Sequence, residues 1–218
     1  MSMSKNSYEG LVDKMTGLKK YECFVKDFES MIGESLDKCE DLSLSMVDID
    51  NFMRVNEEYG YDVGDEVIIS IAEHLKNNVD AKASIYRYAG DQFAILMPST
   101  EKEKAFLIME KIRETYSFNK ETLNGKVNVT ISAGISCFPH DGNRITEVIR
   151  KAEGALYRAK AGERNRVCLS REEKMVTKTS HYTYEQLKRL SELAKREGVG
   201  EAVLLREALD DLLKKYDY

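Results

Sequence analysis

The apolar residues of this chain recur at two spacings, one typical of amphipathic helices and one typical of buried strands. Helical spacing, in which apolar side chains return after three or four residues, marks six stretches: 21–38, 66–76, 102–116, 145–161, 184–196 and 201–215. Short apolar or β-branched runs predict three strands and a hairpin: 42–47, 127–136 and 166–169, with the hairpin over 85–97. Shorter helices are expected over 8–16 and 51–58, with a loop over 59–65.

Helices and strands alternate over residues 1–170, with the hairpin in the middle. This order predicts an α/β sandwich in which helices flank one mostly antiparallel central sheet. The short charged stretch 171–174 is expected to be a linker. Residues 175–218 follow a different order, a polar β-prone segment and then two helices separated by a glycine-containing turn. We therefore expect a second, small module there.

Composition indicates a cytoplasmic protein. The 218 residues are 42% apolar and 33% charged, and the net charge of −5 argues against broad nonspecific attraction to nucleic acid. No apolar run approaches the roughly 20 residues that a membrane-spanning helix needs, so no membrane partner is expected. The four cysteines lack Cys-x-x-Cys spacing and are expected to be reduced thiols.

Two carboxylates lie at positions where a charged side chain is unexpected. Asp48 follows the apolar strand 42–47, and Asp91 lies in the hairpin tip after the small residues Ala89 and Gly90. A carboxylate at the end of a buried strand is costly unless water or a ligand reaches it. If the two strands are neighbours, Asp48 and Asp91 converge into a ligand pair for Mg²⁺ (or Mn²⁺), which takes few protein carboxylates together with phosphate oxygens. The alternative for either residue, taken alone, is an ordinary surface turn.

Five short motifs occur in order along residues 13–167. They are Asp13-Lys14-Met15-Thr16-Gly17-Leu18, Asp48-Ile49-Asp50-Asn51-Phe52, Ala89-Gly90-Asp91-Gln92-Phe93, Ser132-Ala133-Gly134-Ile135, and Ala155-Leu156-Tyr157-Arg158-Ala159-Lys160 followed by Arg164-Asn165. Each motif is weak alone, but together they resemble the GGDEF family, the diguanylate cyclases. The resemblance implies a GGDEF/nucleotidyl-cyclase-like sandwich for residues 1–170. It also implies a homodimer in which two domains, each binding one GTP, face each other and make cyclic di-GMP.

The resemblance implies roles for the strand-end carboxylates. Asp48, the Ile49 carbonyl and Asp91 would bind Mg²⁺, and Asp48 and Asp91 would be the catalytic residues. Gln92 departs from the family, which usually has Glu there, so one negative charge near the metal is absent.

The resemblance also implies the substrate contacts. Asn56 and Asp65 would hydrogen-bond the guanine edge, where a carboxylate accepts from the N1–H and N2–H₂ donors. Lys160 and Arg164 would contact the phosphates. Met53 stands where the family usually has Lys, so one cation near the triphosphate is absent.

These departures leave two functions open. Removing one charged partner from a preorganised site commonly lowers the rate by about 10²–10³-fold. Tyr61 in place of the common His and Ala89 in place of Gly are further departures. The chain is therefore expected to be a diguanylate cyclase with reduced activity. The alternative is a catalytically degenerate regulator that binds GTP or a related nucleotide and couples it to DNA or partner binding, and a purely structural scaffold is a third possibility.

Residues 177–216 resemble a ribbon-helix-helix module, with Gly198-Val199-Gly200 between the two helices. The resemblance implies an intertwined homodimer whose paired strands enter the DNA major groove. Thr177, Thr179 and His181 are the candidate DNA contacts, although the strand could present its opposite face instead. Lys and Arg balance Asp and Glu over 175–218, eight against eight, so dimerisation without DNA binding is an equal alternative.

Overall fold

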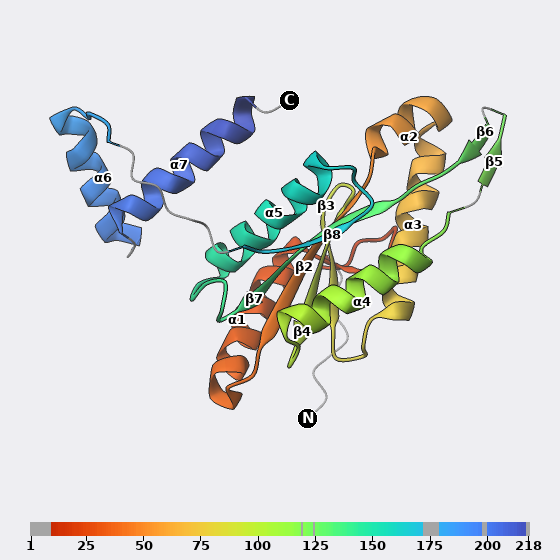
Figure 1. Ribbon diagram of the computed structural model, residues 1–218, viewed down its shortest axis with the longest axis horizontal. Helices are drawn as coiled ribbons and strands as arrows, with labels where there is room; N and C mark the ends of the chain where they lie inside the picture. The colour runs from red at the N-terminus through yellow and green to blue at the C-terminus, as the bar shows by residue number, and fades with distance from the viewer. Residues whose placement is uncertain (1–9, 119, 124, 172–178, 198–199, 217–218) are drawn as a thin grey trace. The chain divides into compact units, whose positions relative to one another are not determined.

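The computed structural model in Figure 1 describes residues 10–118, 120–123, 125–171, 179–197 and 200–216. Contacts between Cα atoms divide the chain into two compact units, Met1–Glu172 and Glu173–Tyr218. The first unit is a central sheet with helices on both faces, and the described part of the second unit holds two helices. The division between the units falls within the stretch 171–174.

Six strands form the central sheet, in the order β1-β3-β4-β2-β7-β8. Their bounds are β1 Lys19–Lys20, β2 Leu42–Ile49, β3 Ser84–Ala89, β4 Gln92–Pro98, β7 Ile131–Phe138 and β8 Val167–Leu169. The three inner pairs are antiparallel, whereas the edge pairs β1–β3 and β7–β8 are parallel. A separate antiparallel hairpin consists of β5 Lys120–Thr122 and β6 Gly125–Val127. The prediction of a mostly antiparallel central sheet is confirmed.

Five helices in the described part of the first unit cover the two faces of this sheet. They are α1 Tyr21–Lys38, α2 Phe52–Tyr59, α3 Tyr61–Asn78, α4 Lys102–Thr115 and α5 Ile145–Ala161. Helices α1 and α5 contribute to one apolar core, and α2, α3 and α4 contribute to the other. Side chains alternate between the faces, so Met46 of β2 lies in the core of α1 and α5 while Val47 lies in the other core.

Strand β2 lies at the centre of the sheet, and all eight of its residues are buried. The antiparallel register sets Asp48, near its end, opposite Gln92 of β4 and Ser132 of β7. Because the period of a strand is two residues, Asp48 points to the same face as Leu44 and Met46, the face that α5 covers. The site described below therefore follows from strand register.

Helix α5 approaches β7 closely because residue 134 has no side chain. A Cβ at Gly134 would lie 2.1 Å from the Leu156 backbone nitrogen and 2.2 Å from the Ala152 carbonyl oxygen. Both atoms belong to the α5 backbone, which cannot rotate away as a flexible side chain would. Gly134 therefore sets the distance between α5 and the sheet, and with it the position of the residues that α5 carries to the site.

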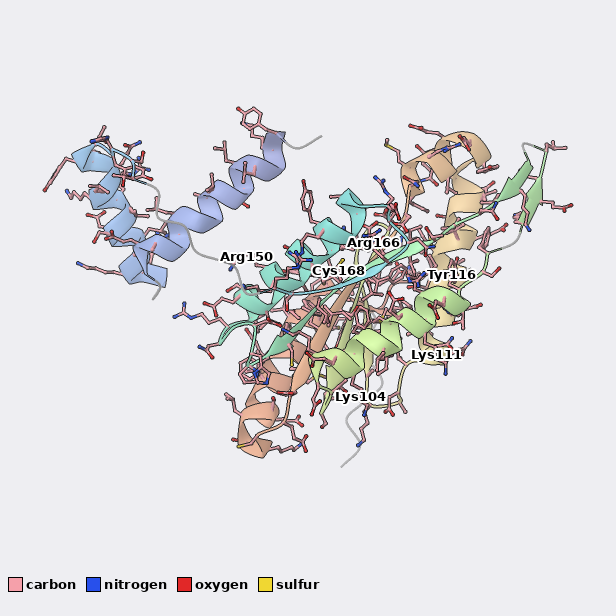
Figure 2. The ribbon with its side chains drawn as sticks, in the orientation of Figure 1. Lys104, Lys111, Tyr116, Arg150, Arg166 and Cys168 are labelled. Carbon is pink, nitrogen blue, oxygen red and sulfur yellow. The ribbon has the colours of Figure 1, made fainter. Side chains whose placement is uncertain are left out.

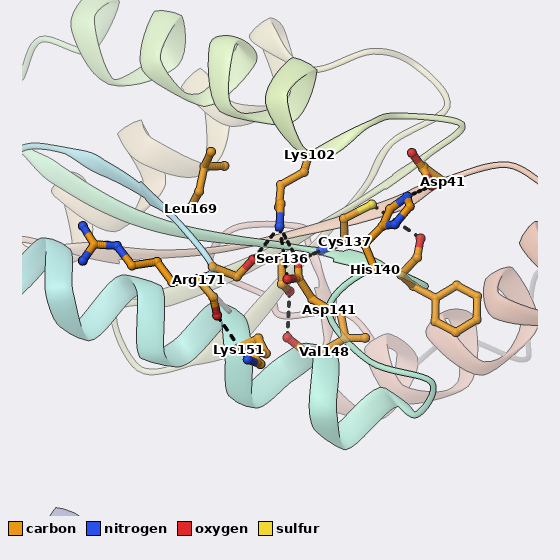
Figure 3. A network of polar contacts seen from close by, with 12 residues as sticks. Asp41, Lys102, Ser136, Cys137, His140, Asp141, Val148, Lys151, Leu169 and Arg171 are labelled. Atoms are coloured by element: carbon orange, nitrogen blue, oxygen red, sulfur yellow. Dashed lines mark hydrogen bonds and ion pairs between the residues drawn. The ribbon is translucent and has the colours of Figure 1, made fainter. Parts of the chain in front are cut away.

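A polar network fixes the end of β8, the last strand of the first unit (Figure 3). Lys102 Nζ lies 3.1 Å from Asp141 Oδ1 and 3.2 Å from Ser170 Oγ, and the Ser170 hydroxyl donates to Asp141 Oδ2 at 2.6 Å. The Cys137 amide donates to the same Asp141 oxygen at 2.8 Å. Because the Asp141 side chain is only 6% exposed, Lys102 neutralises a buried charge. Lys151 Nζ also donates to the Arg171 carbonyl oxygen at 3.1 Å (Figure 3), so the chain is anchored as far as Arg171.

Two sequence predictions on helices are wrong. Residues 59–65 were expected to form a loop, but α3 begins at Tyr61, directly after a left-handed Gly60 with φ of 89°. The described part of the expected helix 8–16, residues 10–16, forms turns instead. The Asp13 carboxylate accepts hydrogen bonds from the Thr16 amide and hydroxyl, and such side-chain bonds compete with helix formation.

Two strand predictions also differ from the structure. The run 127–136 was expected to be one strand, but β7 begins at Ile131, and residues 125–127 pair with β5 instead. In the second unit, the described residues 179–183 of the expected strand 175–183 are not in a strand, and residues 175–178 lie outside the described residues. A strand that pairs only with a second copy has no partner within one chain.

We expect Gly134→Ala to destabilise the first unit by about 2–3 kcal/mol, because the added methyl group forces α5 away from β7. Chemical denaturation would measure the change. Gly33→Ala in α1 is the matched control: nothing lies within 4 Å of a Cβ there, so it should stabilise by about 0.5–1 kcal/mol. Equal stability of the two variants would contradict the close-packing role of Gly134.

Candidate active site at the end of the central strand

Asp48 is the centre of a compact polar cluster at the end of β2. Its side chain is only 2% exposed, and Lys160 Nζ lies 2.7 Å from its Oδ1 atom. The Gln92 side-chain amide donates to the other oxygen, Oδ2, at 2.9 Å. Lys160, in the last turn of α5, thus neutralises the charge of Asp48, and Gln92 of the neighbouring strand β4 holds its second oxygen.

Asp91 lies in the tip between β3 and β4, beside the end of β2. Its carbonyl oxygen accepts a hydrogen bond from the Ile49 amide at 3.4 Å, so the tip is joined to the β2 backbone. Burial raises the pKa of the Asp91 carboxyl, the negative charge of Asp48 raises it further, and Lys160 and Arg87 oppose this less strongly. The structure therefore places Asp48 and Asp91 close enough to interact electrostatically.

Arg87 connects the hairpin tip to the N-terminal turn. Its Nε and Nη2 atoms donate to the Gly90 carbonyl oxygen at 3.0 and 2.8 Å, and its Nη1 atom lies 3.2 Å from Asp13 Oδ2. Burial raises the pKa of Asp13, but hydrogen bonds from Thr16 and the positive charge of Arg87 outweigh it and lower the pKa. Sequence reasoning did not identify Arg87, because nothing in its neighbourhood along the chain marks its contact with Asp13.

The donor set at this strand end fits one hard divalent cation. Each Asp48 oxygen accepts one hydrogen bond and keeps a lone pair, and Asp91 adds a second carboxylate whose ionised form is disfavoured by its surroundings. Among the described residues no group of three or more His, Cys, Asp or Glu side chains forms a metal site. Mg²⁺ commonly binds through one or two carboxylates and keeps several waters, so two carboxylates with the Ile49 carbonyl suit it.

The expected guanine contacts, Asn56 and Asp65, lie on the neighbouring helices α2 and α3. The Asn56 Oδ1 atom is buried and accepts no hydrogen bond within the described part of the chain. It lies against Gly64, where a Cβ would be only 1.9 Å from it, and Asp65 follows Gly64 as an exposed residue. A buried acceptor without a partner calls for an explanation, and a donor on a bound molecule would supply one after rotation of the amide.

The two expected phosphate contacts differ in their surroundings. Lys160 reaches into the cluster and pairs with Asp48, whereas Arg164 is exposed in the loop that follows α5. No contact joins Asn56 or Asp65 to Asp48 or Asp91 within the described residues. The structure thus brings Asp48, Asp91 and Lys160 together, and within the described residues no hydrogen bond or ion pair joins the other three expected substrate contacts to them.

Sequence reasoning included Asp50 in the motif at the strand end but gave it no role, and the structure shows it as a residue only 3% exposed, two positions beyond Asp48. Its carboxylate accepts hydrogen bonds from the Thr130 and Ser132 hydroxyls, each at 2.7 Å. The signal that could have identified its role is its position, because a carboxylate directly after a fully buried strand needs hydrogen-bond partners.

In the second unit, helices α6 Tyr184–Glu197 and α7 Glu201–Tyr216 are described. Of the candidate DNA contacts, Thr179 and His181 are exposed and Thr177 lies outside the described residues. Several large apolar side chains of this unit are 43–66% exposed: Tyr182, Leu187, Leu209, Leu212, Leu213 and Tyr216. A unit of this size cannot bury a sufficient core alone, so these side chains indicate missing packing partners.

None of the described helices is long and apolar enough to cross a membrane. Figure 2 shows instead that surface helix α4 carries charged side chains, among them Lys104 and Lys111, both of which are exposed.

We expect Asp91→Asn to raise the thermal midpoint at pH 7. The folded-state pKa of Asp91 lies above its unfolded value, so its ionisation reduces stability once the pH exceeds the folded-state pKa. Below the unfolded pKa both states hold the proton, and the advantage of the variant should vanish as the pH falls to about 3. Thermal melts from pH 3 to 7 would measure this. The control Glu29→Gln removes an exposed carboxylate from α1, and a Tm difference independent of pH would contradict the assignment.

Comparison with known proteins identifies the family. Residues 10–166 match the sequence model described as "Diguanylate cyclase, GGDEF domain", and residues 177–217 match that of the "Ribbon-helix-helix domain". The chain is 35% identical over 163 residues to Diguanylate cyclase A of Treponema denticola, covering 73% of this chain and 44% of that protein. It is 33% identical over 160 residues to the response regulator PleD of Caulobacter vibrioides, covering 72% and 35%. The chain spans less than half the length of these relatives.

Solved structures show the same fold. The GGDEF domain of DgcB from Caulobacter crescentus in complex with c-di-GMP has a TM-score of 0.69 at 24% identity, with 79% of this chain and 98% of that chain covered. The active GGEEF domain of a diguanylate cyclase from Vibrio cholerae has a TM-score of 0.66 at 28% identity, with 71% and 98% covered. Because the family model spans residues 10–166, most of the chain, this chain belongs to the diguanylate cyclase GGDEF-domain family.

Proposed function

We propose that this protein binds GTP with Mg²⁺ and condenses two GTP molecules to cyclic di-GMP as a homodimer, with reduced turnover. The observation that carries the proposal is the convergence of Asp48 and Asp91 from neighbouring strands, with the Lys160 ammonium 2.7 Å from Asp48. The relatives named diguanylate cyclases support the reaction class. The reaction joins two GTP molecules and releases two pyrophosphates, so each domain supplies half of a symmetric site.

The site residues would have three roles: binding the metal, the phosphates and the guanine base. Asp48, the Ile49 carbonyl and Asp91 would hold the metal, which when bound neutralises triphosphate charge and favours ionisation of the attacking ribose hydroxyl. Lys160 offers its N–H donors to phosphate oxygens from the same place where it now meets Asp48. Asn56 and Asp65 would orient the guanine base, with the Asp65 carboxylate accepting from its N–H groups.

Two neutral residues account for the proposed low turnover. Gln92 donates an amide hydrogen to Asp48 but brings no negative charge for a cation. Met53 of α2 is 73% exposed and brings no positive charge to the triphosphate. Each missing charge is expected to lower the rate by about 10²-fold in a site of this kind.

We expect purified protein with GTP and Mg²⁺ or Mn²⁺ to form cyclic di-GMP slowly, and Gln92→Glu with Met53→Lys to raise the rate by about 10²-fold or more. Chromatographic quantification of the dinucleotide would measure this. Asp91→Asn should abolish turnover, whereas Glu29→Gln, with the same loss of charge on α1, should not change it.

An absence of product, in the double variant as well as in the unaltered protein, would reject the cyclase proposal. Binding of GTP under those conditions would support the alternative of a regulator that couples nucleotide to DNA through the ribbon-helix-helix unit, for which the match to that family speaks. A mobility shift at low salt, with Thr179→Ala and His181→Ala as variants, tests that alternative.

We propose further that the second unit pairs as a homodimer, because its apolar side chains are exposed in one chain. Leu212→Glu is expected to produce monomers and to lower cyclase activity at least tenfold at micromolar concentration, since two sites must meet. Light scattering after gel filtration would measure the mass. Leu107→Glu on α4, where the side chain is 67% exposed, is the control and should remain dimeric. A Leu212→Glu protein that stays dimeric would contradict this pairing.

A further inference from the structure

The loop that follows α5 contains two consecutive residues in the left-handed region. Arg164 has φ of 56° and Asn165 has φ of 46°. A side chain makes this conformation unfavourable, moderately for Asn and more for a long residue such as Arg. Two such residues in succession persist only where neighbouring groups hold them. The loop therefore requires a specific structural cause.

Asp50 provides one of the contacts that hold the loop. The Asn165 amide donates to Asp50 Oδ2 at 3.0 Å, across 115 positions of sequence. The same carboxylate is fixed by the Thr130 and Ser132 hydroxyls, and the Asp50 amide donates to the Thr130 carbonyl oxygen at 2.9 Å. Asp50 is thus a rigid acceptor at the end of β2, aimed at the backbone of the loop.

Helix α4 holds the same loop through a second set of contacts. Arg113 Nη1 donates to Asn165 Oδ1 at 3.1 Å, and Arg113 is itself paired with Glu110 at 2.7 Å. Glu110 also accepts from the Val167 amide at 3.0 Å, which fixes the start of β8. Asn165 is therefore held through both its backbone and its side chain, whereas Arg164 next to it is exposed.

Arg164 is the residue that this arrangement leaves available. Within the described part of the chain its side chain has no hydrogen bond or ion pair. The contacts to Asn165 fix the backbone from which Arg164 projects, close in sequence to Lys160, which points into the cluster. A guanidinium group whose backbone is fixed, and which makes no hydrogen bond or ion pair within the described residues, is suited to binding an anionic ligand.

We infer that Asp50 is a positioning residue, which holds the left-handed backbone of Arg164 and Asn165 so that the Arg164 guanidinium meets the triphosphate alongside Lys160. This inference rests on the proposed binding of GTP at the site. The two carboxylates at the end of β2 then have separate tasks: Asp48 belongs to the reacting centre, and Asp50, directly after the strand, does not touch the substrate but orders the loop that does.

The test compares a triphosphate with a ligand that lacks phosphates. The probes are 3′-deoxyguanosine triphosphate, which has no attacking hydroxyl, and guanosine, each measured by calorimetry with Mg²⁺ on the full chain. Arg164→Ala should weaken the triphosphate about 10–100-fold and leave guanosine unchanged. Asp50→Asn should weaken the triphosphate about tenfold, again with guanosine unchanged. The double variant should match Arg164→Ala within about twofold, because the two residues act through one contact.

A second pair of variants isolates the backbone conformation. Asn165→Gly and Asn165→Ala both lose the contact to Arg113, but only glycine adopts positive φ without penalty. We expect Asn165→Gly to bind the triphosphate about three- to tenfold more tightly than Asn165→Ala, with equal affinities for guanosine. This pair keeps the inference testable if Asp50→Asn fails to fold. Glu29→Gln is the charge control.

The outcomes separate the inference from the proposed function. If the unaltered protein binds neither probe, both are overturned. If Arg164→Ala weakens the triphosphate but Asp50→Asn and Asn165→Ala do not, the inference alone is overturned. Equal weakening of both probes by Asp50→Asn would also overturn it, because it would show a general structural role.

Discussion

The ion pair between Asp48 and Lys160 is the interaction on which the site depends. Asp48 lies near the end of β2, a strand whose eight residues are all buried, and its side chain is only 2% exposed. Removing Lys160 would leave the buried charge of Asp48 without its partner, a loss that can cost up to about 3–5 kcal/mol in a fully buried pair and less here, because the Lys160 side chain is 34% exposed. Lys160 reaches Asp48 from the last turn of α5, and α5 reaches the sheet because residue 134 is glycine. A packing constraint in the core thus determines where the charge of the site is placed.

Gln92 has a different consequence for stability than for function. The register places it directly opposite Asp48, so a glutamate there would add a third carboxylate beside Asp48 and Asp91. Like charges that lie close together are destabilising unless a cation lies between them. The Gln92 amide instead donates to Asp48 and stabilises the site without a metal. With Gln92, the site without a cation is more stable than it would be with a glutamate, so cation binding relieves less repulsion and gains less free energy. This is the trade-off between stability and activity that functional sites commonly show.

The sequence predicted elements well where apolar periodicity was long. Helix α1 and helix α5 have the predicted bounds, 21–38 and 145–161, because each presents a continuous apolar face to the sheet. The prediction failed at residues 59–65, where two glycines suggested a loop. Gly60 does form the break between two helices. Gly64, in contrast, lies inside α3, and glycine is required there because the Asn56 side chain occupies the space that a Cβ would need. Composition alone could not distinguish these two reasons for glycine.

The candidate site was predictable only in part, for a related reason. Asp48 and Asp91 are marked locally, since a carboxylate at a buried strand end or a hairpin tip is conspicuous. The contact between Asp50 and Asn165 joins residues 115 positions apart, and that between Arg87 and Asp13 spans 74 positions. No local pattern encodes such pairs, because they depend on how helices and loops pack around the sheet. Sequence reasoning therefore found the candidate metal ligands but not the contacts through which Asp50 and Arg87 hold the neighbouring segments.

Under the proposed function, both units of the chain require a second copy of the protein. Joining two GTP molecules takes two catalytic domains, and the small second unit exposes leucines that a single copy does not bury. Each catalytic domain is joined to a second unit in the same chain, so pairing of two second units would raise the effective concentration of one catalytic domain near another. For short flexible linkers this effective concentration is commonly in the millimolar range. Contacts of Ser170 and of the Arg171 carbonyl anchor the chain of the first unit as far as Arg171, so the connection to the second unit begins after that residue. The shorter that connection, the more strongly dimerisation of the second unit couples to encounters between the active sites.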